Sequence, residues 1–346
     1  MLKENFYWEF LIRSDNSEKR YSMIYFQFPF DEKIYSTDEK YEIHPIEFHS
    51  FDNAEIKNFK GKIVEISKED FSKLHINSAI LHDEEVIYRA ENKEEYLKKL
   101  EEVIAIIKRN KLPKLVLSRR KMIRNFNSLD LTKSFSNLCL NYPNAFKYVF
   151  FDGKDSWMGA FSEVLGKFNK TTEEFETMSL AGTIPVHENW SQKEIEEQIP
   201  VSDYIRDILQ QYDAENTLQE SETYDHISGN IKHLKTDFKL KINPETLDMI
   251  IRELHPTPAV CGIPKDFCAD QIGKIEKFPR ELYAGYIKIE TEHHIQFFVN
   301  LRCAKLYKNA VHLFVGGGIT AESSPEKEWN ETELKSEAVL KNLVVN

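Results

Sequence analysis

Glutamates recur on two segments that are expected to be helices, and their spacing could build a metal site. Glu194 and Glu197 lie three residues apart in the first segment, and Glu328 and Glu331 lie three residues apart in the second. Residues at positions i and i+3 share one face of a helix. Two such faces opposed across a cleft would offer carboxylate oxygens, the ligands that magnesium prefers. A solvated helix face is the simpler interpretation of either segment alone.

Two further side chains could move protons. Lys114 begins an apolar segment typical of a strand, and Glu163 follows another apolar stretch. Enclosure among apolar groups lowers the pKa of a lysine and raises the pKa of a carboxyl group. Lys114 could then act as a general base and Glu163 as a proton donor near neutral pH. Taken alone, each residue fits a structural role better.

Two other features could bind an anion. Arg302 interrupts an apolar run, where a guanidinium needs a carboxylate or phosphate partner from the protein or from a ligand. Gly316–Gly318 follow a predicted strand and precede a predicted helix, so their N–H groups could approach an anion closely. A flexible turn is the alternative for these glycines. The segment lacks the glycine spacing of the nucleotide-binding loops.

The elements that must position these residues are strands followed by long helices. Apolar residues at helical spacing predict helices from Asn92 through Ile107, over 129–140 and from 191 to 211, where Pro200 should kink or split the last one. Two more helices are predicted to begin at 243 and 324. Strands are predicted over 6–12, 21–28, 114–118, 146–151, 156–161, 164–168, 174–179, 283–289, 295–304 and 310–315. The order predicts an α+β fold in which large antiparallel-rich β-sheets are layered with outer α-helices.

Composition limits the partners and the compartment. The chain has 346 residues, 41% of them hydrophobic, and a formal net charge of −11, which disfavours nucleic acid and anionic membrane surfaces. No apolar run approaches the roughly 20 residues that a membrane helix needs. The four cysteines form no Cys-x-x-Cys pair, and no signal pattern is recognised at the N-terminus. These features predict a cytoplasmic protein with reduced thiols.

Taken together, the segments resemble the chorismate-binding enzyme family from about Glu91 to the C-terminus. Nine motifs occur in the order of that family: Lys114-Leu-Val-Leu-Ser-Arg119, Trp157-Met-Gly-Ala-Phe-Ser-Glu163, Leu180-Ala-Gly-Thr183, Lys193-Glu-Ile-Glu-Glu197, His255-Pro-Thr-Pro-Ala-Val-Cys-Gly262, Arg280-Glu-Leu-Tyr-Ala-Gly285, Leu301-Arg-Cys-Ala304, Gly316-Gly-Gly-Ile319 and Pro325-Glu-Lys-Glu-Trp-Asn-Glu-Thr-Glu-Leu-Lys335. The resemblance implies one chorismate-binding domain over 1–346, with a divergent β-rich part over 1–90 and a catalytic core over 91–346.

The resemblance also implies roles for individual residues. Glu197 and Glu331 match magnesium ligands, and Glu194 and Glu328 match further or water-mediated ones. The family's substrate-binding positions correspond to Gly182, Thr183, His255, Tyr283, Arg302, Gly316 and Lys335. Lys114 matches the lysine that activates water at C2 of chorismate, and Glu163 the acid that protonates the departing C4 hydroxyl group.

Isochorismate synthase activity, a magnesium-dependent isomerisation of chorismate, is the resulting expectation. Relatives that add ammonia at C2 typically have glutamine in place of Lys114, and those with a lysine nucleophile have it where this chain has Ala181. A salicylate synthase, and an aminating anthranilate or aminodeoxychorismate synthase component, remain the alternatives. A catalytically silent binding protein of the same fold is a third. The product would pass to downstream enzymes of either menaquinone or siderophore biosynthesis.

Overall fold

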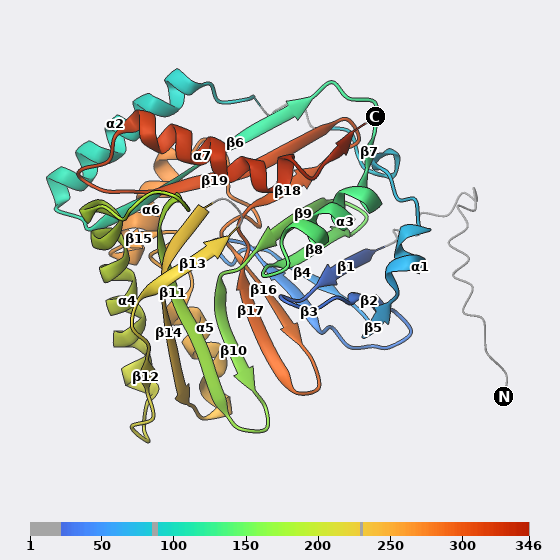
Figure 1. Ribbon diagram of the computed structural model, residues 1–346, viewed down its shortest axis with the longest axis horizontal. Coiled ribbons are helices and arrows are strands. Elements are labelled where there is room, and N and C mark those ends of the chain that lie inside the picture. Colours follow the sequence, from blue (N-terminus) through green and yellow to red (C-terminus); the bar gives the residue numbers. More distant parts are fainter. Residues whose placement is uncertain (1–21, 85–88, 229–230, 346) are drawn as a thin grey trace.

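Two large antiparallel sheets form the framework of the protein (Figure 1). The computed structural model describes residues 22–84, 89–228 and 231–345. Every strand pair in these residues for which a register is defined is antiparallel, and a short third sheet pairs β7 (Leu129–Asp130) with β20 (Val344–Val345). The predicted α+β class is therefore confirmed. The strand predicted over 6–12 lies outside the described residues.

The first sheet combines strands from all parts of the described chain. Its order is β15–β6–β19–β18–β9–β8–β1–β2–β5. These strands are β15 (Gly262–Ile263), β6 (Lys114–Arg124), β19 (Ala310–Ile319), β18 (Cys303–Leu306), β9 (Ser156–Phe161), β8 (Phe146–Phe151), β1 (Met23–Gln27), β2 (Ile34–Asp38) and β5 (Lys62–Ile66).

The second sheet has the order β12–β14–β11–β10–β17–β16–β3–β4, and β13 also pairs with β14. Its strands are β12 (Gln219–Glu220), β14 (Ile231–Lys241), β11 (Glu174–Pro185), β10 (Val164–Asn169), β17 (His294–Val299), β16 (Tyr286–Glu290), β3 (Ile46–His49), β4 (Ile56–Phe59) and β13 (Tyr224–Ser228). The N-terminal strands thus extend one end of each sheet.

Helices cover the outer faces of the sheets (Figure 1). On the first sheet, α2 (Lys93–Asn110) and α7 (Pro325–Leu340) lie along β6 and β19, α6 (Lys265–Ile275) packs against β6 and β15, and α3 (Leu131–Asn141) packs on β8 near the short α1 (Lys68–Ser72). On the second sheet, α4 (Gln192–Tyr212) covers β11 and β14, and α5 (Leu247–Leu254) covers β10. One large cluster of buried aromatic and aliphatic side chains draws on both sheets and on α4 and α5.

Three predictions about elements need correction. Pro200 does not split α4, which is continuous from Gln192 to Tyr212. The predicted strand over 295–304 is two strands, β17 and β18, which belong to different sheets. Gly316–Gly318 are part of β19 and pair with β6, so they form neither a turn nor a loop before a helix.

No helix in the described part of the chain is long and apolar enough to cross a membrane.

Candidate active site

The site forms where the chain crosses twice from one sheet to the other. Glu163 lies between β9 of the first sheet and β10 of the second, and Arg302 lies between β17 of the second and β18 of the first. The two crossings run beside each other, since Val299 N donates to Glu163 O (3.1 Å) and Ala160 N donates to Arg302 O (3.3 Å). Arg302 has a positive φ of 44°, which is uncommon for a residue with a side chain. The crossing therefore sets the direction of both functional side chains.

A cavity of about 770 Å³, counted to its open mouth, lies at these crossings. Nine of the residues predicted from the sequence line it: Lys114, Glu163, Gly182, Thr183, Glu197, Tyr283, Arg302, Gly316 and Lys335. Apolar side chains including Phe161, Leu180 and Phe314 line the rest. Residues spread over more than two hundred positions of the sequence thus meet in one place.

Lys114 enters the cavity from the first residue of β6. Its side chain is 2% exposed, and its Nζ lies 2.7 Å from Glu197 Oε1 on α4. Gly318 makes room for this pair, because a Cβ atom there would lie 2.3 Å from both Glu197 Oε1 and Lys114 Cε. A glycine at position 318 is thus a steric requirement of the Lys114–Glu197 contact.

Glutamates from α7 approach β19 at Gly317, the residue before Gly318. A Cβ atom on Gly317 would lie 3.3 Å from Glu328 Oε2 and 3.5 Å from Glu331 Oε1. Pairing of β18 with β19 ends at Cys303 and Phe314, whereas β19 continues to Ile319, so the glycine segment presents a backbone edge to the cavity. Neighbouring strand residues point to opposite faces. Glu197 and the α7 glutamates would therefore meet around this edge.

The four glutamates do not form a closed ligand set in this arrangement. Glu331 Oε1 pairs with Lys335 Nζ (2.7 Å), and Glu328 Oε1 accepts a hydrogen bond from Ser323 Oγ (2.7 Å). Glu194 caps its own helix, since its Oε2 accepts from Ser191 N (3.0 Å) and Ser191 Oγ (2.5 Å). Within the described residues, no three His, Cys, Asp or Glu side chains are arranged to hold a metal ion.

Glu163 is held as a weak acid. Its side chain is buried, 5% exposed, and burial raises its pKa to about 7, against the opposing influence of Lys114, Lys335 and Arg302. A carboxyl group with this pKa is about half protonated at neutral pH and can donate a proton there. The sequence prediction of a raised pKa is in accord with this environment.

Arg302 is oriented by a histidine that sequence reasoning missed. His233 Nδ1 lies 2.9 Å from Gly182 O and 3.1 Å from Thr183 Oγ1, and Arg302 Nη2 lies 2.8 Å from His233 Nε2. A carbonyl oxygen only accepts, so Nδ1 carries the proton and Nε2 accepts from the guanidinium. Burial, and then the nearby Arg302, lower the pKa of His233 well below its usual value, so this ring is neutral. A lone histidine in a strand has no spacing signal that could have identified it.

The remaining substrate-binding predictions divide into two groups. Tyr283, Gly316 and Lys335 are together, since Lys335 Nζ donates to Gly316 O (3.0 Å) and a Cβ on Gly316 would lie 2.9 Å from the Tyr283 hydroxyl oxygen. His255 is not brought into the cavity. Its Nε2 lies 3.3 Å from Phe51 O, its ring packs edge-on against Tyr286, and burial lowers its pKa to about 3. His255 Nδ1 is buried and has no hydrogen-bond partner within the described residues, and the assignment of His255 to the ring pocket stays a prediction.

The fold and the site define an α+β protein with a buried cavity that holds a lysine, a weakly acidic carboxyl group and further cations. The chain belongs to the chorismate-binding enzyme family, which it matches over residues 15–344.

Curated relatives resemble parts of the chain. Isochorismate synthase MenF of Escherichia coli strain K12 is 29% identical over 204 residues, which are 55% of this chain and 46% of that protein. Isochorismate synthase EntC of the same strain is 34% identical over 152 residues, 43% of this chain and 39% of that one. These matches therefore span less than half the length of either relative.

Solved structures resemble nearly the whole chain. The menaquinone-specific isochorismate synthase MenF of E. coli superposes with a TM-score of 0.76 at 21% identity, covering 94% of this chain and 89% of that one. Anthranilate synthase component I of Streptococcus pneumoniae superposes with a TM-score of 0.63 at 20% identity, covering 72% and 58%. At these identities the likeness establishes a shared fold.

Proposed function

We propose that the chain is an isochorismate synthase, which isomerises chorismate by adding water at C2 and expelling the C4 hydroxyl group. The observation that carries the proposal is that Lys114 and Glu163, a candidate base and a candidate acid, are both buried and line the same cavity. The names of the relatives at 29% and 34% identity support the choice of reaction.

The charges in the cavity suit a dianionic substrate. Arg302 and Lys335 line the cavity in a protein whose net charge is −11, so the local cations reverse the overall field. Guanidinium and ammonium groups bind carboxylates through charge-assisted hydrogen bonds. We assign the two carboxylates of chorismate to Arg302 with Tyr283, and to Lys335 with the Gly316 backbone. Gly182 and Thr183 would border the ring.

Lys114 and Glu163 carry the proton transfers in this proposal. Lys114 Nζ accepts a proton from water as the water oxygen bonds to C2, both ring double bonds shift, and the C4–oxygen bond breaks. Protonated Glu163 donates to the departing oxygen, which leaves as water. The pKa of Glu163, raised to about 7 mainly by burial, keeps the acid form available near neutral pH. Before it can act as a base, Lys114 must release its contact with Glu197.

Magnesium is part of the proposal, and the donor set of the site fits it. Glycines at 317 and 318 leave space beside the carboxylates of Glu197, Glu328 and Glu331, and carboxylate oxygens are hard ligands. We assign Glu197 and Glu331 as ligands, with Glu328 and Glu194 as further or water-mediated ones. When bound, the ion would neutralise the ring carboxylate of chorismate and stabilise negative charge that develops beside C2.

Product identification tests the proposal. Purified protein is incubated with chorismate, with and without magnesium, EDTA and ammonium, and the products are separated by chromatography. We expect isochorismate in the presence of magnesium, none with EDTA, and no response to ammonium. Lys114→Ala should abolish turnover and retain the circular dichroism spectrum, whereas Lys108→Ala, a change of an exposed lysine on α2, should be fully active.

Each other outcome contradicts a named part of the proposal. Salicylate as the product would contradict the assigned end point, and ammonium-dependent anthranilate would contradict the use of water. Binding of chorismate without conversion would make the chain a silent member of the family. Full activity of Lys114→Ala would remove the assigned base.

A further inference from the structure

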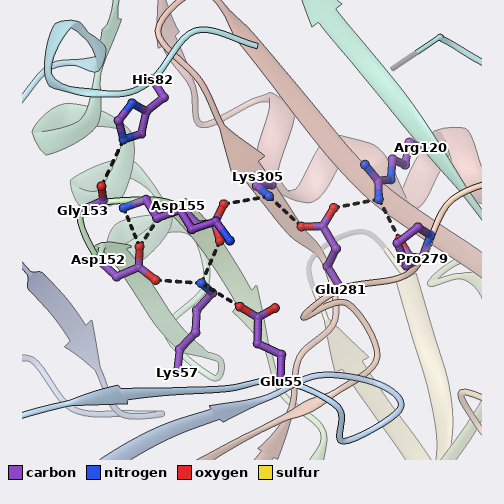
Figure 2. Close-up of polar contacts among 11 residues, drawn as sticks. Glu55, Lys57, His82, Arg120, Asp152, Gly153, Asp155, Pro279, Glu281 and Lys305 are labelled. Atoms are coloured by element: carbon purple, nitrogen blue, oxygen red, sulfur yellow. Dashed lines mark hydrogen bonds and ion pairs between the residues drawn. The ribbon is translucent and has the colours of Figure 1, made fainter. Parts of the chain in front are cut away.

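A chain of alternating charges links the second sheet, at Lys57 on β4, to the first sheet, at Lys305 on β18 and Arg120 on β6, outside the cavity (Figure 2). Lys57 Nζ lies 2.8 Å from Asp152 Oδ2 and 2.7 Å from Asp155 Oδ2. Asp155 Oδ1 lies 2.8 Å from Lys305 Nζ, which also contacts Glu281 Oε2 at 2.7 Å. Glu281 Oε1 in turn accepts from Arg120 Nη2 (2.8 Å). Five elements or turns far apart in the sequence are thereby connected.

The chain of charges is largely buried and nearly balanced. Lys57, Lys305 and Arg120 supply three positive charges, and Asp152, Asp155 and Glu281 supply three negative ones. The exposed Glu55 adds a fourth carboxylate, 3.1 Å from Lys57 Nζ. Burial opposes charging, but the hydrogen bonds of Lys57 with Asp152 and Asp155 outweigh it and raise the pKa of Lys57. Buried ion pairs contribute little net stability compared with apolar packing, but they fix the geometry of the groups they join. This chain is thus suited to setting positions.

Glu281, which joins Lys305 to Arg120 in the chain of charges, lies on the turn that carries Tyr283. Glu281 and Ala284 both have positive φ values, 52° and 60°, so this turn is tight and needs support. Arg280 anchors it on one side through Glu276 and the carbonyl of Val260 (2.6 Å). Glu281 anchors it on the other side through Lys305 and Arg120. Two charged side chains just before Tyr283 therefore anchor its turn to different parts of the protein.

A second contact links the chain to the cavity wall. The Arg120 guanidinium lies 4.6 Å from the centre of the Phe314 ring, and that ring stacks on Tyr283 at 5.8 Å with an angle of 23°. Phe314 and Tyr283 both line the cavity. The cationic end of the chain therefore supports the wall from behind while Glu281 holds the turn.

We propose that Glu281 and Lys305 are positioning residues, which fix Tyr283 for substrate binding through the chain that ends at Arg120. The inference rests on the proposed function for its kinetic consequence. Its structural consequence, order in the turn over 280–285, can be measured without substrate. A small displacement of a binding group costs roughly 10- to 100-fold in efficiency.

Lys305→Met and Lys57→Met form a matched pair that tests the proposal. Both lysines are 9% exposed, and each change removes one positive charge from the same chain. In Lys305→Met every carboxylate keeps a cation, because Asp155 retains Lys57 and Glu281 retains Arg120, so the variant should fold. In Lys57→Met, Asp155 retains Lys305, and the turn of Tyr283 keeps its full support. Asp152 loses the cation of Lys57 but keeps hydrogen bonds from the backbone N–H groups of Lys154 and Asp155.

We expect Lys305→Met to raise the KM for chorismate about tenfold with kcat changed less than about threefold, since Tyr283 serves binding. Lys57→Met should leave KM and kcat within about threefold of the wild-type values. Glu281→Gln, which keeps the shape and removes the charge, should behave like Lys305→Met. Hydrogen exchange at the amides of Tyr283, Ala284 and Gly285 should be at least about tenfold faster in Lys305→Met than in the wild type, and unchanged in Lys57→Met.

Two results would overturn the inference: equal effects of the two lysine changes on exchange in the turn, or faster exchange in Lys305→Met with an unchanged KM. A wild-type protein that neither binds nor converts chorismate would instead contradict the proposed function. In that case the comparison of hydrogen exchange still decides whether the chain of charges orders the turn.

Discussion

Burial gives Glu163 the property that acid catalysis requires. Its carboxyl group has neighbouring cations, which favour the charged form, but enclosure by apolar groups outweighs them and raises the pKa to about 7. The ionised form is therefore unfavourable in the folded protein and acceptable in the unfolded chain. A group selected for proton donation should consequently reduce the stability of the fold above the pH at which the unfolded chain ionises.

Replacing Glu163 with glutamine should expose this trade-off. The folded pKa of about 7 lies above the unfolded value of 4.5, so the contribution of protonated Glu163 is fully present below about pH 4.5 and is lost as the pH rises towards 7. Glu163→Gln should therefore match the wild type near pH 4.5 and gain up to about 3 kcal/mol in the free energy of unfolding above pH 7. Turnover should be lost.

Denaturant titrations of both proteins from pH 4.5 to pH 8 give this measurement. A difference between the two proteins that does not change with pH would mean that Glu163 is not held neutral by its surroundings. Stability gained together with retained turnover would remove Glu163 as the acid.

At this scale the sequence was informative where residue type alone restricts the surroundings. A lysine at the start of an apolar strand and an arginine inside an apolar run both need a special environment, and Lys114 and Arg302 have one in the cavity. His233 carries no such signal, because its partners Gly182 and Thr183 lie some fifty residues away and meet it only through the pairing of β11 with β14. Glu194 caps its own helix through Ser191, and its role as a further or water-mediated magnesium ligand stays a prediction.

The glycines of β19 give that strand a role that a strand with side chains could not fill. Gly316, Gly317 and Gly318 leave room for Tyr283, the α7 glutamates, and the pair of Lys114 and Glu197 in turn. These glycines lower the stability of the strand, because glycine has no side chain to pack against either face of the sheet. Strand β6 pairs with β19 along its whole length, glycines included, and β18 adds a second neighbour over 311–314, which offsets this cost.

Gly318→Ala should inactivate the protein while leaving it folded. The added Cβ would lie 2.3 Å from Glu197 Oε1 and from Lys114 Cε, so both flexible side chains must turn away. We expect turnover to fall by at least about 100-fold, because a misplaced base loses its reactive geometry. Gly273→Ala on α6 is the control, since nothing lies within 4 Å of its new Cβ and alanine favours a helix by about 1 kcal/mol.

Steady-state rates and thermal unfolding of both variants provide the check. Normal turnover in Gly318→Ala would show that Lys114 need not lie beside Glu197 for activity. Loss of turnover in Gly273→Ala would reveal an effect of substitution that does not depend on contact with the cavity.

At the level of elements, the sequence predicted the strands that flank the site, but it missed β2 to β5 and β12 to β14 and did not show where the chain changes sheets. The crossing between β17 and β18 is only three residues long, 300–302, and lies between two apolar runs, so hydrophobicity alone gives one strand. Asn300 causes the break, since its side chain donates to Leu282 O (2.8 Å) and accepts from the Tyr148 hydroxyl (3.0 Å). These partners lie far away in sequence, and Arg302 owes its place in the cavity to this break.

On the scale of the whole molecule, the N-terminal strands of the described residues belong to the two sheets that form the site. Strands β1, β2 and β5 extend the first sheet, and β3 and β4 extend the second. Ile24, Phe26, Phe48 and Phe59 belong to the same buried cluster as Tyr283. The sequence marked residues 1–90 as divergent, and we propose that they nevertheless form one folding unit with 91–346.

A chain reduced to residues 91–346 should therefore fail to reach the native state. Its sheets would end at β8 and β16, where Phe150 and Ile287, both buried in the complete chain, would lose their neighbours from β1 and β3. Each such side chain that becomes exposed loses about 1.5–3 kcal/mol of folding free energy. The sum over a few side chains exceeds the usual net stability of a domain. We expect the shortened chain to lack a near-ultraviolet circular dichroism spectrum, and the complete chain to unfold in one transition seen alike by circular dichroism and fluorescence. A shortened chain that unfolds cooperatively, or two separate transitions in the complete chain, would instead assign the N-terminal strands to a domain of their own.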